Sequence, residues 1–141
     1  MTAPTWTDTR QAIYTRLDAQ LTADVWSPKA PQNAQGESST PFPYVVIVQA
    51  TEVPWNTSGT RGAEFVVQID GFARSGAGQS SEQVIASLHS GVREALEYFT
   101  LSIANATWVD TEFETMSLGW SDEGKTRRFI SIYRITLDGT S

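Results

Sequence analysis

Apolar residues recur at helical spacing in two stretches of the chain. In the first, an apolar or aromatic residue appears about every fourth position: Ile13, Tyr14, Leu17 and Leu21. This spacing places the side chains on one stripe of a helix. Thr7 or Asp8 can accept hydrogen bonds from the free N–H groups of the first turn. We therefore predict a helix from about Asp8 to Leu21.

The second stretch has a stronger pattern. Its apolar residues fall on one face of a helix at about 100° per residue: Val84, Ile85, Leu88, Val92, Ala95, Leu96 and Phe99. The charged residues of this stretch lie off that face, and Ser80 or Ser81 can cap its start. Because both predicted helices are apolar on one side only, each must pack against another layer.

The rest of the chain predicts that layer as a set of strands. The first of them, PYVVIVQA, is apolar and β-branched on both faces, as a central strand is. The other three strands alternate apolar and polar side chains. In the strand predicted over residues 108–118, Val109 and Phe113 are expected on the face opposite the acidic residues. The polar segment from Ser121 to Lys125 predicts a hairpin. The four strands are expected over residues 43–50, 63–74, 108–118 and 127–137.

The predicted elements follow one another as helix, strand, strand, helix, strand, strand. They favour an α+β fold: a two-layer sandwich with a mainly antiparallel four-stranded sheet and both helices on one face. We expect residues 1–141 to form one domain. The opposite face of the sheet is expected to carry apolar side chains and to be covered by another subunit: Val66, Phe72, Ile130 and Ile132.

Composition excludes several classes of function. The 141 residues include no cysteine and one histidine, so disulfides, thiol catalysis and cysteine-ligated metal sites are excluded. The net charge is −6, whereas tight nucleic-acid binding needs clustered Lys and Arg. No apolar run approaches the ~18 residues of a membrane span, and the N-terminus lacks the pattern of a signal peptide. We expect a soluble cytosolic product without a membrane address.

Two features of the sequence are candidates for a catalytic or binding site. His89 belongs to the residue type most often used as a general base, but it sits at the edge of an apolar helical stripe and no GxSxG motif occurs. The favoured interpretation is a histidine that packs its ring. Gly76-Ala77-Gly78 lies between a strand and a helix, but Ser81 occupies the third glycine position and no Walker lysine follows. We predict no enzyme, no cofactor and no metal.

Three acidic residues alternate along one predicted strand: Asp110, Glu112 and Glu114. Paired carboxylates can serve glycoside hydrolysis or hold a hard cation, but both uses need a concave pocket and a strand face is flat. The favoured interpretation is a solvated face with cross-strand pairs to Arg128 and Arg134. The alternative is an acidic surface that faces a channel through which DNA passes, where like charge prevents sticking.

Three tryptophans are expected in or beside loops. Exposed tryptophans are enriched at binding hot spots, yet each of these can also fold back over the core: Trp26, Trp55 and Trp120. The segment from Ser27 to Thr40 has no hydrophobic period and is expected to form a long loop.

The succession of segments resembles a known family. A helix with AIYTRL leads to Val25-Trp26, and then to TPFPYVVIVQATE, WNTSGTRGAEFVVQIDGFARSGAG, VIASLHSGVREAL and RRFISIYRITL. This order is similar to that of the tail-completion or tail-terminator proteins of long-tailed phages and related gene-transfer particles. The similarity covers nearly the whole chain, and its most specific parts are PFPYV and the Trp-Asn-Thr…Gly connection.

The resemblance implies a structural virion protein at the tail–head junction, assembled in the host cytoplasm. Its copies would form a ring, usually hexameric, that caps the tail tube, stops polymerisation and meets the head connector. The partners are then further copies, the major tail tube protein and the connector, while DNA only passes through the lumen. The family brings no catalytic residues. Candidate contacts are the connections 27–40 and 52–62 and the residues Trp26, Trp55, Asn56, Thr57, Ile130 and Ile132.

Two alternatives remain open. One is a head-completion or stopper protein of the same connector, which differs in the ring it binds. The other is a small cytosolic ligand-binding α+β domain, which predicts a defined pocket and a rise in melting temperature when ligand binds.

Overall fold

A computed structural model describes residues 4–27, 42–56, 61–75, 78, 80–97, 100–121 and 126–139. It contains the two predicted helices, α1 (Trp6–Gln20) and α2 (Ser81–Glu97). Five strands accompany them: β1 (Asp24–Trp26), β2 (Tyr44–Asn56), β3 (Arg61–Ala73), β4 (Ala106–Ser121) and β5 (Thr126–Gly139).

The strands form one sheet in the order β1-β2-β3-β5-β4. Three of the pairings are antiparallel, including the predicted hairpin of β4 and β5, but β1 pairs with β2 in parallel. The predicted four-stranded sheet is therefore wrong in strand number, and the predicted order of elements lacks β1 between the first helix and the first predicted strand. The sheet is mixed but, as predicted, mainly antiparallel. The residue pattern missed β1 because three residues are too few to show a period of two.

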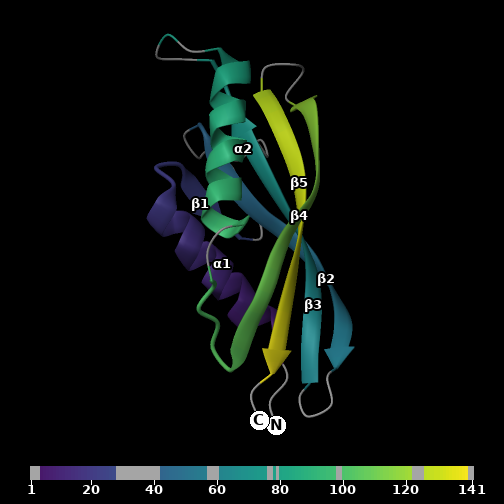
Figure 1. Ribbon diagram of the computed structural model, residues 1–141. Helices are drawn as coiled ribbons and strands as arrows, with labels where there is room; N and C mark the ends of the chain where they lie inside the picture. The colour runs from purple at the N-terminus through teal and green to yellow at the C-terminus, as the bar shows by residue number, and fades with distance from the viewer. Residues whose placement is uncertain are drawn as a thin grey trace, which may run out of the picture.

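Both helices cover the same face of the twisted sheet (Figure 1). The core lies between the two layers. It combines Ile13 and Leu17 of α1 with the apolar stripe of α2 and the inward residues of the strands. On β3 and β5 the inward residues are the odd-numbered ones, which include Phe65, Val67, Ile69, Phe129, Tyr133, Ile135 and Leu137. We call the opposite side of the sheet the helix-free face; it carries Tyr44, Val46, Val66, Gln68, Asp70, Phe72, Ile130 and Ile132.

The start of α1 differs from the prediction. Thr5, rather than Thr7 or Asp8, is the N-cap residue, and its hydroxyl accepts a hydrogen bond from the Asp8 backbone N–H at 3.2 Å. The helix begins two residues earlier than expected because Thr5 has the extended backbone that an N-cap requires. At the other end, Leu21 is the C-cap residue, and its N–H donates to the Leu17 carbonyl.

The predicted cap of α2 at Ser80 is confirmed. The Gln83 N–H donates to the Ser80 hydroxyl at 3.2 Å, and the Ser80 N–H donates to the Gln83 side-chain oxygen at 3.0 Å. These reciprocal bonds form a capping box, which satisfies two of the free donors at the helix start. Farther along α2, a Cβ at Gly91 would lie 2.9 Å from Leu21, so glycine allows the end of α1 to approach α2 closely.

Strands β2 and β3 are longer than the predicted strands 43–50 and 63–74. They include most of the expected connection 52–62. Trp55 pairs with Gly62 and Asn56 with Arg61 in the antiparallel ladder. The sequence suggested a loop here because Pro54 and the following polar residues disfavour strands. A proline is tolerated at this point because β1 pairs only with Tyr44–Val46, which leaves this part of β2 at the sheet edge.

Two β-bulges interrupt β4, one between Trp108 and Asp110 and one between Phe113 and Thr115. Each bulge inserts an extra residue and shifts which side chains point inward. Trp108 and Phe113 pack against the core, whereas Val109 is 43% exposed. The predicted placement of Val109 with Phe113 is therefore wrong, because strict alternation does not hold across a bulge.

Candidate assembly surface

An aromatic cluster covers the end of the helix-free face near β1. Tyr44 and Val46 of β2 are buried there although no described helix lies over them. The Tyr44 ring stacks on the Phe72 ring with centroids 4.9 Å apart, and the centroid of the Phe42 ring lies 5.2 Å from that of Tyr44. The apolar side chains of this end therefore bury one another, which gives the face a preformed, rigid patch.

A polar network lies beside this cluster in the middle of the sheet. The Arg128 guanidinium pairs with the Asp70 carboxylate at 2.5 Å, and Asp70 is only 2% exposed. The Gln68 amide donates to the other Asp70 oxygen at 3.0 Å, and Gln49 donates to Gln68 at 3.2 Å. The network satisfies the buried carboxylate with two donors. Arg128 was expected to pair with the acids of the strand 108–118, whereas its partner is Asp70 of β3.

The structure places Ile130 and Ile132 on the helix-free face, as predicted. They lie on β5 opposite Asp70 and Gln68 of β3, respectively. Both side chains are half-buried, and so is their neighbour Val66. They lie beside the polar network and outside the aromatic cluster, since their ladder partners are Asp70, Gln68 and Arg134.

The acidic strand shows the predicted cross-strand pairing in part. The Arg134 guanidinium of β5 contacts the Glu114 carboxylate of β4 at 3.1 Å. Glu112 lies opposite Arg134 in the ladder, and Asp110 lies opposite Thr136. Asp110 and Glu112 are exposed and take part in no ion pair within the described ranges. Two unpaired acids thus line the outer edge of the sheet.

The tryptophan predictions have different outcomes. Trp26 was expected in a loop but belongs to β1, where it pairs with Val46 and packs against the aromatic cluster. Trp55 and Asn56 lie at the end of β2, and the environment of their side chains is not described. Thr57 lies outside the described residues, as does the expected loop after Ser27 as far as Thr40.

Trp120 is the most exposed of the large hydrophobic residues that the structure describes, at 55%. The guanidinium carbon of Arg127 lies 4.7 Å from the centroid of its ring. Arg127 in turn forms an ion pair with Glu82 in the first turn of α2. This chain of contacts orders the end of the hairpin against α2 but leaves one face of the indole in solvent.

His89 packs its ring against two aromatic rings, as its favoured interpretation predicted. The centroids of Phe113 and Phe129 lie 5.4 and 5.1 Å away. Burial and the nearby Arg93 guanidinium lower the pKa of His89 below 6.5, while Glu97 opposes this effect. Its Nδ1 is buried without a hydrogen-bond partner among the described residues. The residue is therefore a neutral packing element of the α2–sheet contact.

Tyr133 is a second buried polar group in the same layer. Its side chain is fully buried, and its ring centroid lies 5.5 Å from that of Phe113. Burial and the Glu97 carboxylate raise the pKa of the Tyr133 hydroxyl far above its ordinary value. The phenol thus stays protonated, and nothing described around it forms a nucleophile–base pair.

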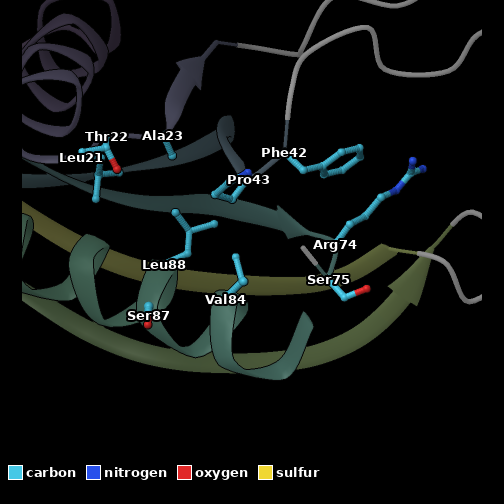
Figure 2. A pocket seen from close by; sticks show the side chains of 10 residues that line it. All are labelled: Leu21, Thr22, Ala23, Phe42, Pro43, Arg74, Ser75, Val84, Ser87 and Leu88. Carbon is cyan, nitrogen blue, oxygen red and sulfur yellow. The ribbon is translucent and has the colours of Figure 1, made fainter. Parts of the chain in front are cut away.

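A groove opens where the helices meet the first part of the sheet (Figure 2). Its volume is about 520 Å³. The residues that line it follow α1, precede β2, follow β3 or belong to the first half of α2. Arg74 at its mouth is already engaged: its guanidinium lies 4.3 Å over the Phe42 ring and its Nε donates to the Thr126 hydroxyl at 2.9 Å. The groove therefore offers mainly apolar and small side chains: Leu21, Ala23, Pro43, Val84, Ser87 and Leu88.

A smaller cavity of about 260 Å³ lies between α1 and the end of β1. The Trp26 indole N–H and the Ser27 hydroxyl are buried at its wall without hydrogen-bond partners among the described residues. Arg10 and Tyr14 of α1 complete the wall. The cavity thus gathers hydrogen-bond donors at the β1 edge.

Within the described ranges, no cluster of three or more histidine or acidic side chains could hold a metal ion. No described helix is both long enough and apolar enough to cross a membrane.

Comparison with known proteins gives a family and a fold. The family model described as "Tail completion protein gp17" matches residues 11–138. No curated protein matches the chain. Among solved structures with the same fold is a chain of the structure described as "Virion of native gene transfer agent (GTA) particle". The two chains are 16% identical with a TM-score of 0.72, and the match covers 96% of this chain and 100% of that one.

Proposed function

The chain belongs to the tail completion protein gp17 family, and from this membership we propose a structural protein of a phage-type tail as its role. Residues 1–141 act as one domain in this proposal. The described surface is suited to binding other proteins rather than to chemistry, so we assign it no catalytic step.

The copies form a closed ring in this proposal. We propose six copies for it, the number that the sequence resemblance implies. The ring caps the finished tail tube, stops further polymerisation and joins the tube to the head connector at the tail–head junction. A ring needs a heterologous contact, in which two different patches of each copy meet. The partners are then other copies, the tube protein and the connector, and DNA passes through the lumen.

The observation that carries this proposal is the helix-free face. It presents an ordered aromatic cluster and the half-buried side chains of Ile130, Ile132 and Val66 without a covering layer among the described residues. Apolar surface of this kind is costly to leave in water, so apolar side chains that no layer covers favour a protein-binding site. We assign this face, rather than the helix layer, to contacts within the particle.

The acidic outer edge of the sheet supports a place beside passing DNA. Asp110 and Glu112 are exposed and unpaired in the described part of the chain. A carboxylate surface repels the phosphate backbone and keeps it from binding to the wall.

Light scattering over a concentration series tests the ring. The wild-type chain is expected to show the mass of a closed ring, near six copies. Ile132→Lys places a charge on the helix-free face and should lower that mass to the monomer. Ser90→Lys adds the same side chain at an exposed position of α2 and should leave the ring intact. A melting curve of each variant verifies folding, and equal masses for both variants would remove the face from the proposal.

Tube assembly tests the capping role directly. When purified major tail tube protein polymerises in the presence of the chain, we expect short tubes with the added protein at one end by electron microscopy. Unchanged tube lengths together with binding to a purified connector ring would favour the alternative, a head-completion or stopper protein. A monomer at every concentration that binds neither ring but melts higher with a small ligand would favour the ligand-binding domain.

A further inference from the structure

The sheet has two open edges that differ in sequence. Within the described part of the chain, β4 has one sheet neighbour, β5, along its whole length. On the other side of the sheet, β1 pairs only with Tyr44–Val46, so the edge of β2 from Gln49 to Asn56 has no neighbour among the described residues. Open edges present free backbone N–H and C=O groups that can pair with another strand.

Exposed apolar side chains concentrate on these two edges. Four large hydrophobic residues are exposed in the described ranges, and all of them belong to β2 or β4: Val53 at 43%, Val109 at 43%, Leu118 at 47% and Trp120 at 55%. A single exposed valine is ordinary. Their confinement to the two strands with open edges is not expected from chance and points to edges that are covered in the assembled protein.

Val53 and Asp110 lie in the same row of the sheet, at its opposite edges, and Val109 is the neighbour of Asp110 in β4. Val53 pairs with Glu64 of β3, Glu64 pairs with Thr136 of β5, and Thr136 pairs with Asp110 of β4, next to Val109. A second copy placed beside the first without a shift along the strands therefore brings Asp110 of one copy opposite Val53 of the other, with Val109 one residue away along β4.

The strand directions also fit. β4 is antiparallel to β5, β5 is antiparallel to β3, and β3 is antiparallel to β2, so β4 runs opposite to β2. If a rotation about an axis parallel to the strands relates neighbouring copies, the strands have the same directions in every copy. The contact between neighbouring copies is then antiparallel, which allows a regular hydrogen-bonded ladder.

We propose that the open edge of β4 in one copy pairs antiparallel with the open edge of β2, residues 49–56, in a second copy, with Asp110 opposite Val53 and Val109 one residue away along β4. This inference rests on the proposed ring and adds an edge-to-edge contact to the contact that we assign to the helix-free face. The two edges are different patches, so the association is heterologous and continues around a closed ring.

Acidic side chains flank both edges, so the contact is expected to depend on ionic strength. Glu52 of β2 and Asp110 and Glu112 of β4 are exposed. Because like charges across the contact repel and salt screens them, association is expected to increase several-fold from low to high ionic strength. A decrease with salt would contradict this arrangement of edges.

Cysteine crosslinking tests the contact, since the chain has no cysteine of its own. Val53→Cys and Val109→Cys chains are mixed at high salt and treated with a short bis-maleimide. We expect a crosslinked dimer in the mixture, little in either variant alone, and a ladder of covalent oligomers from a chain that carries both substitutions. The matched control mixes Val53→Cys with Leu118→Cys, which has a similarly exposed side chain on β4 about 30 Å farther along the strand.

The outcomes separate this contact from the ring itself. Crosslinking of Val53→Cys with Val109→Cys but not with Leu118→Cys supports the pairing. A ring mass in light scattering without that crosslink, or an equal yield with the control, overturns the edge pairing and leaves the ring in place. A monomeric mass at every concentration without crosslinks overturns both.

Discussion

The Arg128 guanidinium lies 2.5 Å from the carboxylate of Asp70, an aspartate that is 2% exposed on the face of the sheet that no described helix covers. The arginine side chain itself is 36% exposed. The two partners of this ion pair are therefore unequal, because only one of them loses contact with water.

This asymmetry predicts unequal costs of removing each partner. Arg128→Met keeps the aliphatic stem but leaves the buried carboxylate unpaired, and we expect a loss of about 2–3 kcal/mol in the free energy of unfolding. Asp70→Asn removes the buried charge and should cost about 1 kcal/mol. Urea denaturation of both variants measures the difference. Equal losses would mean that Gln68, which also donates to Asp70, satisfies the carboxylate by itself.

A second prediction concerns the close contact between Gly71 and the Phe129 ring. A Cβ at Gly71 would overlap the carbon atoms of that ring, which is fully buried. Gly71→Ala should therefore lower the free energy of unfolding by about 1–3 kcal/mol or more, because a packed core cannot absorb the added methyl group. Gly119→Ala is the control, since no atom lies within 4 Å of its added Cβ. A change beyond about 0.5 kcal/mol in the control would weaken this reading.

A third prediction follows from the lowered pKa of His89, which burial causes first and Arg93 second. In the unfolded chain the imidazole gains a proton near pH 6.5, whereas in the folded protein it does so only at lower pH. Between these pH values the unfolded state binds more protons, so the free energy of unfolding decreases as the pH falls below about 6.5. Below the pKa of His89 in the folded protein, this residue causes no further decrease.

His89→Phe should reduce this pH dependence while retaining the packing against Phe113 and Phe129. The measurement is the urea midpoint at about pH 7.5 and about pH 5.5 for both chains. A midpoint of the wild type that falls no more than that of His89→Phe over this range would show that the imidazole is not desolvated.

The fourth prediction compares two threonines at the start of α1. Thr5→Ala removes the hydroxyl that accepts from the Asp8 N–H and should cost about 1 kcal/mol of stability. Thr7→Ala changes an exposed residue within the helix and should be close to neutral. Chemical denaturation of the pair tests the position of the cap, and a larger loss for Thr7→Ala would return the cap to the position expected from the sequence.

The placement of side chains on the sheet shows where sequence reasoning succeeded. Ile130 and Ile132 alternate with core residues of β5, and that period alone placed them on the helix-free face. The acids of β4 were predicted to pair across strands, and Glu114 does so with Arg134. Trp26 was missed as a strand residue because β1 is held by its partner β2 rather than by a pattern of its own.

The sequence by itself determined both helices, four of the five strands, the β4–β5 hairpin and the cap at Ser80, because these depend on periodicity and side chains a few residues apart. Tertiary structure alone decided the parallel strand β1, the bulges that expose Val109, the burial of Asp70 against Arg128 and the row that Val53 shares with Asp110. These features join residues tens of positions apart. A local pattern cannot specify them, since register and burial are fixed only when the strands pair and the layers pack.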